Sequence, residues 1–280
     1  MVMPCIVCGN DKTKKLYDVL LQCLGCGFIR ADSDVTQEDL KELYDKKYFF
    51  GEEYADYLKE EKALRKNFKR NLKLISKFCP SGRMLEIGCA YGFFLDLARQ
   101  NYDVEGIEIN EEACSYAKEQ FNLNVKCGDF LEHDFTENYY DIVAMWATIE
   151  HVKSPDLYIK KISRLLKPGG IFVCTAPDIG STLAKIQKKK WRQIHPPTHL
   201  NYFSKNTLEK LLNNCDLNLI KTIWLGEYRT TNQALYIILV LRNKMEKLYD
   251  FFDKLGLTQA VFYLNTYDQI CTVAAKKSFK

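Results

Sequence analysis

Four cysteines near the start of the chain have the spacing of metal ligands. Cys5 and Cys8 form one Cys-x-x-Cys pair, Cys23 and Cys26 form a second, and a glycine follows each pair. Two such pairs supply the four sulfur ligands that Zn²⁺ prefers in tetrahedral structural sites. The spacing therefore predicts a zinc ribbon over residues 1–31.

The segment between the two cysteine pairs, residues 15–22, has the composition of a single short strand. A module of about 30 residues is too small to fold without its metal. A redox dithiol is the alternative, but that chemistry uses one Cys-x-x-Cys at a helix N-terminus beside a βαβ unit. The other seven of the eleven cysteines are single, so no disulfide framework is expected.

Length and composition limit the classes of protein that fit. The chain has 280 residues, of which 47% are hydrophobic and 27% charged, with a net charge of +4. These values predict one large domain plus a small module and exclude a disordered or collagen-like chain. The net charge is too small to indicate a nucleic-acid partner. No 18-residue apolar run and no secretory signal is visible, so we expect a cytoplasmic protein without a transmembrane segment.

A change of pattern after the cysteines separates a helical linker from a longer alternating region. Residues 32–80 predict helices at 36–44 and 54–78. From residue 81 strands and helices alternate, which predicts an α/β domain with a doubly wound parallel sheet over 81–280. The expected strands are 83–87, 104–109, 125–127, 140–146 and 170–176, and the expected helices are 93–100, 111–120 and 157–166.

In such sheets ligands bind beyond the carboxyl ends of the strands. After the first strand comes a small-residue turn, Gly88-Cys-Ala90-Tyr-Gly92, that suits a nucleotide but lacks the Gly-x-Gly-x-x-Gly fingerprint of NAD sites. Glu108 ends the second strand, where a carboxylate can accept both hydroxyls of a ribose. Asp129 follows the third strand, where it can accept from an adenine amino group.

The ordered set of motifs resembles the class I S-adenosylmethionine-dependent methyltransferases. It consists of LEIGCAYG at 85–92, Glu108, Gly-Asp at 128–129, IEHV at 149–152 and LKPGG at 166–170. The resemblance covers roughly residues 82–275. It implies a Rossmann-like, seven-stranded sheet whose last strand, at 269–275, is antiparallel.

The resemblance also implies which residues bind S-adenosylmethionine. The methionine part would lie among Glu86, Gly88, Ala90 and Gly92. Glu108 would bind the ribose, Asp129 and Phe130 the adenine, and Trp146 with Ala147 the far end of the pocket. Ala90 stands where the family often has glycine.

Methyl transfer often requires a base, and histidine is the usual candidate near neutral pH. The chain has four histidines. His133 is expected to be a surface residue. His151 is expected to position its loop, or to be a second catalytic candidate. His195 and His199 flank two prolines, which are expected to hold this segment extended, and Ser204 is expected to cap the next helix.

The segment 191–204 resembles the stretch that lines the acceptor pocket of bacterial methyltransferases acting on sugars and other small molecules. A cysteine-rich zinc module also precedes the catalytic domain of sugar C-methyltransferases, where a His/Tyr set handles a proton. His199 and Tyr202 match that set loosely. His199 is the candidate base, and a structural histidine is the alternative.

Two further segments allow more than one interpretation. The basic stretch 185–192 is expected to be a solvated helix face, with a clamp for a diphosphate or an RNA backbone as the alternative. The insert 226–267 contains apolar runs for which core packing is the default; a lid, a dimer contact or a membrane contact are the alternatives.

The sequence thus predicts a methyltransferase acting on a small molecule, with a sugar or nucleotide-linked sugar as the leading acceptor, as a monomer or homodimer. S-adenosylmethionine is the expected cofactor and zinc a structural ion. A methyltransferase of RNA or protein, and a non-catalytic S-adenosylmethionine-binding protein, are the alternatives.

Overall fold

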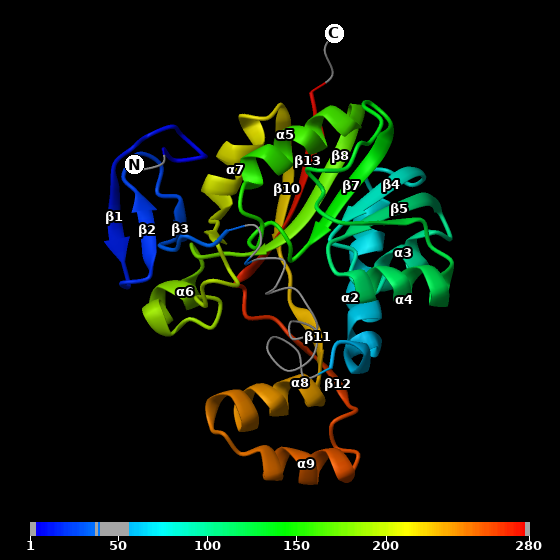
Figure 1. Ribbon diagram of the computed structural model, residues 1–280, viewed down its shortest axis with the longest axis vertical. Coiled ribbons are helices and arrows are strands. Elements are labelled where there is room, and N and C mark those ends of the chain that lie inside the picture. The colour runs from blue at the N-terminus through cyan, green and yellow to red at the C-terminus, as the bar shows by residue number, and fades with distance from the viewer. Residues whose placement is uncertain (1–3, 37–38, 40–55, 278–280) are drawn as a thin grey trace.

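The computed structural model describes residues 4–36, 39 and 56–277, so most of the predicted helix 36–44 lies outside the described residues. The described part has a central sheet with helices on both faces (Figure 1). The cysteine-rich module lies at one side of this sheet. A helical arm extends away from the body at the far end.

The central sheet has seven strands in the order β10-β13-β8-β7-β4-β5-β6. β13 pairs antiparallel with β8 and β10, which confirms the predicted antiparallel last strand. The order reverses at β4, which lies between β5 and β7, so the ligand crevice is expected there. The strands are β4 (Gly82–Ile87), β5 (Tyr102–Glu108), β6 (Val125–Cys127), β7 (Tyr140–Trp146), β8 (Leu166–Pro177), β10 (Leu217–Trp224) and β13 (Gln269–Lys276).

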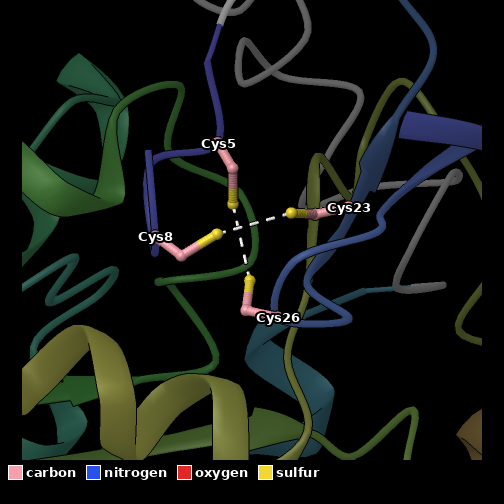
Figure 2. A group of neighbouring side chains, drawn as sticks. All are labelled: Cys5, Cys8, Cys23 and Cys26. Carbon is pink, nitrogen blue, oxygen red and sulfur yellow. Dashed lines mark hydrogen bonds between the residues drawn. The ribbon is translucent and has the colours of Figure 1, made fainter. Parts of the chain in front are cut away.

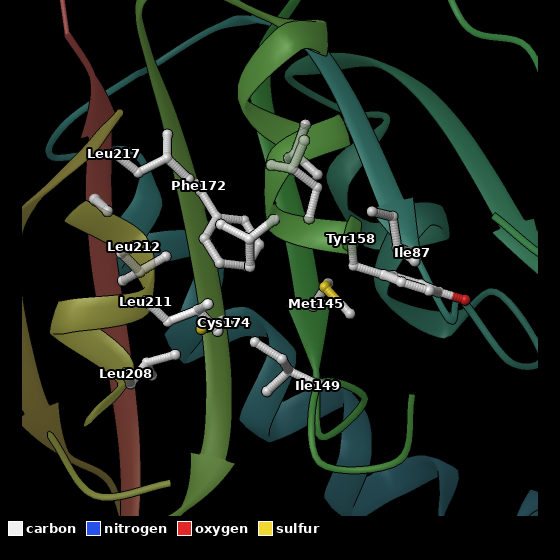
Figure 3. Close-up of a cluster of buried hydrophobic side chains, with 14 of the residues drawn as sticks. Ile87, Met145, Ile149, Tyr158, Phe172, Cys174, Leu208, Leu211, Leu212 and Leu217 are labelled. Carbon is white, nitrogen blue, oxygen red and sulfur yellow. The ribbon is translucent and has the colours of Figure 1, made fainter. Parts of the chain in front are cut away.

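Alternate residues of each buried strand enter two separate cores. Leu85 and Met145 pack with α5 (Pro155–Leu165) and α7 (Lys205–Asn213), in the core of Figure 3. Met84 and Ala144 point to the other face, which is covered by the helices α2 (Glu61–Ile75), α3 (Phe93–Ala98) and α4 (Glu111–Phe121). This alternation is the period of two that a strand imposes on its side chains.

Local capping fixes where the helices begin. The side chain of Asn110 accepts from the backbone nitrogen of Ala113 at the start of α4, and a proline opens α5. Ser204 caps α7 in a reciprocal box with Thr207, which confirms its predicted role. Only two residues separate the end of β5 from the start of α4, so the loop that carries the ligand-facing groups is short and fixed.

The cysteine-rich module has three strands rather than the single one expected between the cysteine pairs. β1 (Thr13–Leu16) and β2 (Leu20–Cys23) form a hairpin, and β3 (Ile29–Ala31) pairs with β2. Tyr17 and Asp18 make the turn with φ of 56° and 65°. Neither residue is a glycine, so Asp18 alone leaves only a weak turn signal in the sequence. A fourth strand, β9 (Asn201–Tyr202), joins this sheet from the α/β part of the chain.

The insert forms an arm with an exposed apolar surface, so the default expectation of core packing is wrong for its helices. β11 (Glu227–Thr230) pairs with β12 (Val261–Leu264) at its base, and α8 (Thr231–Leu235), a π-helix (Tyr236–Arg242) and α9 (Glu246–Lys254) follow β11. Ile238 is 48% and Phe251 55% exposed. In the described part of the chain, no helix is long and apolar enough to cross a membrane.

Candidate active site

The small-residue turn after β4 lies close to the loop after β7. Gly88 has φ +74°, and a Cβ there would lie 2.7 Å from Oγ1 of Thr148. Ala90 also has a positive φ, 45°. Gly92 has φ +82° and caps α3, where a Cβ would lie 2.7 Å from Cδ1 of Leu123. The turn is therefore shaped by close packing and left-handed backbone, both of which favour glycine.

A large cavity opens at the carboxyl ends of β4, β5 and β7, where the strand order reverses. It is lined by all the residues predicted to bind the cofactor except Gly92, which packs behind the turn against Ala117 of α4 and against Leu123, two residues beyond that helix. The lining set from that prediction is Glu86, Gly88, Ala90, Glu108, Asp129, Phe130, Trp146 and Ala147. The structure thus brings together residues that span about 60 positions of sequence, as the topological switch point requires.

Glu108 is held rigidly at the end of β5. Its Oε1 accepts from the backbone nitrogens of Ile109 and Asn110 at 2.9 and 3.0 Å, and its Oε2 accepts from that of Ala90 at 2.8 Å. Burial raises the pKa of this carboxyl, although the three backbone donors oppose the shift. Its remaining lone pairs suit the two hydroxyls of a ribose.

Two polar atoms at the cavity have no hydrogen-bond partner among the described residues. They are Oε2 of Glu86 and Nε1 of Trp146. Burial, and then the charge of Glu108, raise the pKa of Glu86 well above its usual range. A bound cation beside Glu86 would relieve this cost, so the cavity fits the ammonium group of the methionine part of S-adenosylmethionine.

Asp129 and Phe130 form the next part of the cavity wall. Asp129 accepts from the backbone nitrogen of Leu131 at 2.7 Å and from the hydroxyl of Tyr158 at 3.2 Å. The ring of Phe130 packs 5.2 Å from that of Tyr158. A carboxylate beside aromatic rings suits the amino group and flat face of an adenine.

Two aromatic residues of this cavity come from outside the domain to which the sequence assigned the cofactor site. Tyr57 and Phe68 come from the segment predicted as a linker, and both line the cavity. Tyr57 stacks on Tyr91 with ring centroids 5.5 Å apart. Neither residue belongs to a motif, and only the tertiary packing of α2 onto α3 brings them to the strand ends.

A second, polar cavity adjoins the first, and both share Ala147 and His151 in their walls. Its other charged and polar side chains come from five separate parts of the chain: Glu60 and Asn67; Glu150; Arg192, Gln193 and His199; Glu227, Tyr228, Arg229 and Gln233 of the insert; and Gln269. Such a site, with many hydrogen-bonding groups, suits a hydrophilic ligand that meets the cofactor at the shared wall.

Three histidines gather at the second cavity. The ring of His199 lies 4.6 Å from that of His151 and 3.9 Å from that of His195. The Nδ1 atoms of His151 and His199 lie 2.9 Å from the carbonyl oxygens of Thr198 and Gln193. Since a carbonyl only accepts, each Nδ1 carries the hydrogen and each Nε2 is the basic nitrogen.

Burial is the main reason that both imidazoles are neutral. It lowers the pKa of His151 to about 4 and that of His199 well below its usual range. Ligand atoms of Glu150, His151 and His199 lie within 4.8 Å of one another. The same lone pairs could therefore bind one divalent cation or accept a proton.

The expectation that the two prolines hold the neighbouring segment extended is wrong. The backbone nitrogens of Thr198 and His199 both lie within hydrogen-bond reach of the carbonyl oxygen of His195, at 3.2 and 3.4 Å. This turn brings His195 and His199 together. The hydroxyl of Tyr202 donates to the carbonyl of His199 at 3.0 Å. His133, expected at the surface, is half-buried, and its Nε2 bonds to the carbonyl of Cys127.

The four cysteine sulfurs converge as the spacing predicted (Figure 2). Sγ of Cys5 lies 3.6 Å from that of Cys26, and Sγ of Cys8 lies 3.5 Å from that of Cys23. Sulfurs bound tetrahedrally to Zn²⁺ lie about 3.8 Å apart, which follows from a Zn–S bond of about 2.3 Å. The set therefore fits a zinc ion with little movement.

The lysines of the basic stretch are exposed on α6 (Thr182–Gln187) and on a 3₁₀ turn, Lys188–Lys190. Among its residues, Arg192 lines the second cavity.

The comparisons with known proteins agree with the fold. The family described as "Methyltransferase domain" matches residues 55–222, which is more than half of the chain. The chain therefore belongs to this family, and it is a class I S-adenosylmethionine-dependent methyltransferase.

The curated relatives match only part of this chain. A ubiquinone biosynthesis O-methyltransferase of Coxiella burnetii is 31% identical over 93 residues, 31% of this chain and 40% of the relative. An enzyme of the same name from Cereibacter sphaeroides is 31% identical over 126 residues, 43% of this chain and 50% of the relative. The chain thus spans about half or less of the length of these relatives.

Solved structures confirm the fold at low sequence identity. An S-adenosylmethionine-dependent methyltransferase from Archaeoglobus fulgidus covers 83% of this chain and 100% of its own, with a TM-score of 0.57 and 20% identity. The PH0226 protein from Pyrococcus horikoshii covers 76% and 91%, with a TM-score of 0.54 and 19% identity.

Proposed function

We propose that this methyltransferase transfers the methyl group of S-adenosylmethionine to a small hydroxylated acceptor, with a sugar or nucleotide-linked sugar as the leading class. The observation that carries the proposal is the second cavity, whose polar lining meets the cofactor cavity at Ala147 and His151. A sugar offers many hydroxyls to such a lining, and Arg192 adds a positive charge for a phosphate group.

The cofactor is proposed to lie across the switch point of the sheet. Glu86 would pair with its ammonium group, Glu108 would accept from the ribose, and Asp129 with Phe130 would hold the adenine. Gly88 and Ala90 would let the backbone approach the methionine part, and Gly92 would support the turn from behind. The bound cofactor supplies the electrophilic methyl group; the protein aligns the acceptor with it and excludes water.

His199 is proposed to take the proton that the acceptor loses. Its Nδ1 is bonded to a backbone carbonyl, so its Nε2 has the lone pair that a base needs. His151 has the same arrangement and lines both cavities, so we propose that it positions the acceptor beside the cofactor. Tyr202 is proposed to assist by fixing the backbone of His199 through its hydroxyl.

A screen with labelled cofactor tests the acceptor class and the base together. Nucleotide-sugars and free sugars should accept label with the wild-type enzyme. His199→Asn, which keeps a polar group but has no basic nitrogen, should bind the cofactor normally and lose turnover by about 100-fold or more. His133→Asn is the matched control, since His133 lies outside the second cavity. Full activity of His199→Asn would refute the assignment of the base.

The names of the curated relatives provide a second acceptor class for the same screen. Relatives named for ubiquinone biosynthesis are O-methyltransferases, so hydroxylated aromatic compounds belong among the acceptors tested. Label on these compounds alone would replace the sugar by an aromatic acceptor. Label on RNA or protein alone would favour a methyltransferase of RNA or protein, with the exposed lysines at 185–190 as its binding surface.

Zinc is proposed as the structural ion of the ribbon, bound by Cys5, Cys8, Cys23 and Cys26. The convergence of four sulfurs supports this proposal. Thiolate ligands survive best in a reducing compartment, so the cytoplasm is the proposed location.

A further inference from the structure

The zinc ribbon and the segment that carries His199 share one sheet. β9 begins two residues after His199, and it pairs antiparallel with β3 of the ribbon: Tyr202 lies opposite Ile29, and Asn201 opposite Arg30. The backbone nitrogen of Ala31 also donates to the carbonyl of Leu200 at 2.9 Å. β9 has only two residues, so its position depends on the strand with which it pairs.

β9 in turn holds the loop that follows β7. The backbone nitrogens of Leu200 and Asn201 donate to the carbonyl of Glu150 at 2.8 and 3.0 Å. The side-chain nitrogen of Asn201 donates to the carbonyl of Val152 at 2.7 Å. These bonds fix the loop on both sides of His151, whose own Nδ1 is bonded to Thr198.

The ribbon and β9 also share a small apolar core. It consists of Leu20, Ile29, Ala31, Leu200 and Tyr202, each at most 9% exposed. The ring of Phe28, two residues after Cys26, packs 5.3 Å from that of Phe203. The ribbon also packs on the main core through Val7, Cys23 and Phe28. Its strands have three or four residues each, so we expect their own arrangement to depend on the sulfur site.

We propose that the ribbon is the positioning element of the acceptor side of the active site: its metal-held strand β3 fixes β9, and β9 fixes His199 and His151. The cofactor cavity is built mainly from the ends of β4, β5 and β7, which pair with each other and with β6 and β8 rather than with the ribbon. The loop that β9 fixes contributes His151 and Val152 to its wall. Loss of the ribbon metal should therefore impair proton acceptance much more than cofactor binding. This inference rests on the proposed roles of the two histidines.

The test compares two variants of the full chain with a matched control. Cys23→Ser removes a ribbon sulfur, and Asn201→Ala removes the side-chain bond to Val152 while leaving the ribbon intact. Cys79→Ser is the control, because Cys79 lies outside the ribbon. Amide hydrogen exchange at 150–152 and 199–203, calorimetric binding of S-adenosylmethionine, and metal content are measured for each.

In Cys23→Ser, exchange at Leu200 and Asn201 should speed up by about tenfold or more, while the cofactor Kd changes by less than about threefold. Asn201→Ala should retain its metal, show faster exchange at 150–152, and lower kcat more than it raises the acceptor KM. Unchanged exchange at 200–201 in Cys23→Ser would overturn the proposal. So would equal loss of protection in β4 and β5, which would make the ribbon a general stabiliser.

If Cys23→Ser does not fold, Asn201→Ala decides alone, and wild-type exchange at 150–152 in that variant would overturn the proposal. The exchange measurements need no acceptor. They therefore separate a failure of this inference from a failure of the proposed base, which the turnover of His199→Asn tests.

Discussion

Oε2 of Glu108 lies 2.8 Å from the backbone nitrogen of Ala90, so the carboxylate at the end of β5 is bonded to the small-residue turn after β4. This contact joins the two predicted cofactor motifs. It fixes the Glu108 carboxylate beside the turn at Gly88–Gly92 before any ligand binds. Such preorganisation lowers the cost of binding.

Glu108→Gln should weaken S-adenosylmethionine binding by about tenfold to 100-fold, because a charge-assisted hydrogen bond is worth about 1.5–3 kcal/mol. The amide group would also turn a donor toward one of three backbone N–H groups. Calorimetric titration measures the Kd. Glu105→Gln on the same strand is the control, since Glu105 is absent from the lining of the cavity. Equal affinity of Glu108→Gln and wild type would contradict the ribose role.

Binding of S-adenosylmethionine should release protons at mildly acidic pH. Burial raises the pKa of Glu86 and of Glu108 above 4.5 in the free protein. The ammonium group and ribose hydroxyls of the cofactor favour the ionised carboxyls, so binding lowers both pKa values. Binding enthalpies measured in buffers of different ionisation enthalpy should therefore differ, and the difference should shrink in Glu86→Gln.

The raised pKa values of Glu86 and Glu108 also determine how the stability of the free protein changes with pH. A carboxyl whose folded-state pKa is raised stabilises the fold fully below its unfolded-state value of about 4.5, and this contribution is lost as the pH rises through the raised pKa. Glu86→Gln should remove part of this dependence. Denaturant unfolding across this pH range measures it, and identical profiles for variant and wild type would contradict burial of an ionisable Glu86.

The strand-end motifs were predictable because each lies directly after a buried apolar run, and a parallel sheet brings such ends together. Tyr57 was not predictable, because helix α2 carries no motif that places it at the cavity. The pairing of β3 with β9 joins residues about 170 positions apart through a strand of two residues, too short for any period. The Tyr17–Asp18 turn was missed because an aspartate with no glycine beside it is only a weak turn signal.

The turn after β4 should respond in opposite ways to two substitutions. Gly92→Ala places a Cβ 2.7 Å from Leu123 at a positive φ and should cost about 1–3 kcal/mol of unfolding free energy. Ala90→Gly removes a Cβ from a left-handed position and should be neutral or stabilise by up to about 1 kcal/mol. Urea unfolding of both variants checks this. Destabilisation by Ala90→Gly as large as that by Gly92→Ala would contradict the interpretation.

Protein purified without chelator should contain about one zinc per chain, since four thiolates form one closed tetrahedral site. Cys5→Ser should lose most of this metal, and Cys215→Ser should keep it, because Cys215 lies outside the sulfur cluster. Zinc that remains in Cys5→Ser, but is lost when His151 and His199 are both replaced, would assign the metal to the Glu150 cluster instead.

A buried carboxylate attaches the base of the arm to the second cavity. Glu60 accepts from Oγ1 of Thr230 at 2.6 Å and from the side-chain nitrogen of Asn232 at 3.1 Å. Thr230→Val keeps the shape of the side chain and removes the hydroxyl, so it leaves a buried carboxylate short of a donor and should cost about 1–3 kcal/mol.

The control for Thr230→Val is Thr231→Val, whose hydroxyl bonds an exposed carbonyl, that of Leu257. Because Arg229 and Gln233 of the arm line the second cavity, Thr230→Val should also raise the KM of the acceptor. The affinity for S-adenosylmethionine should stay unchanged, since the cofactor cavity has no residue of the arm in its lining. A raised Kd for the cofactor with an unchanged acceptor KM would show that the second cavity is not the acceptor site.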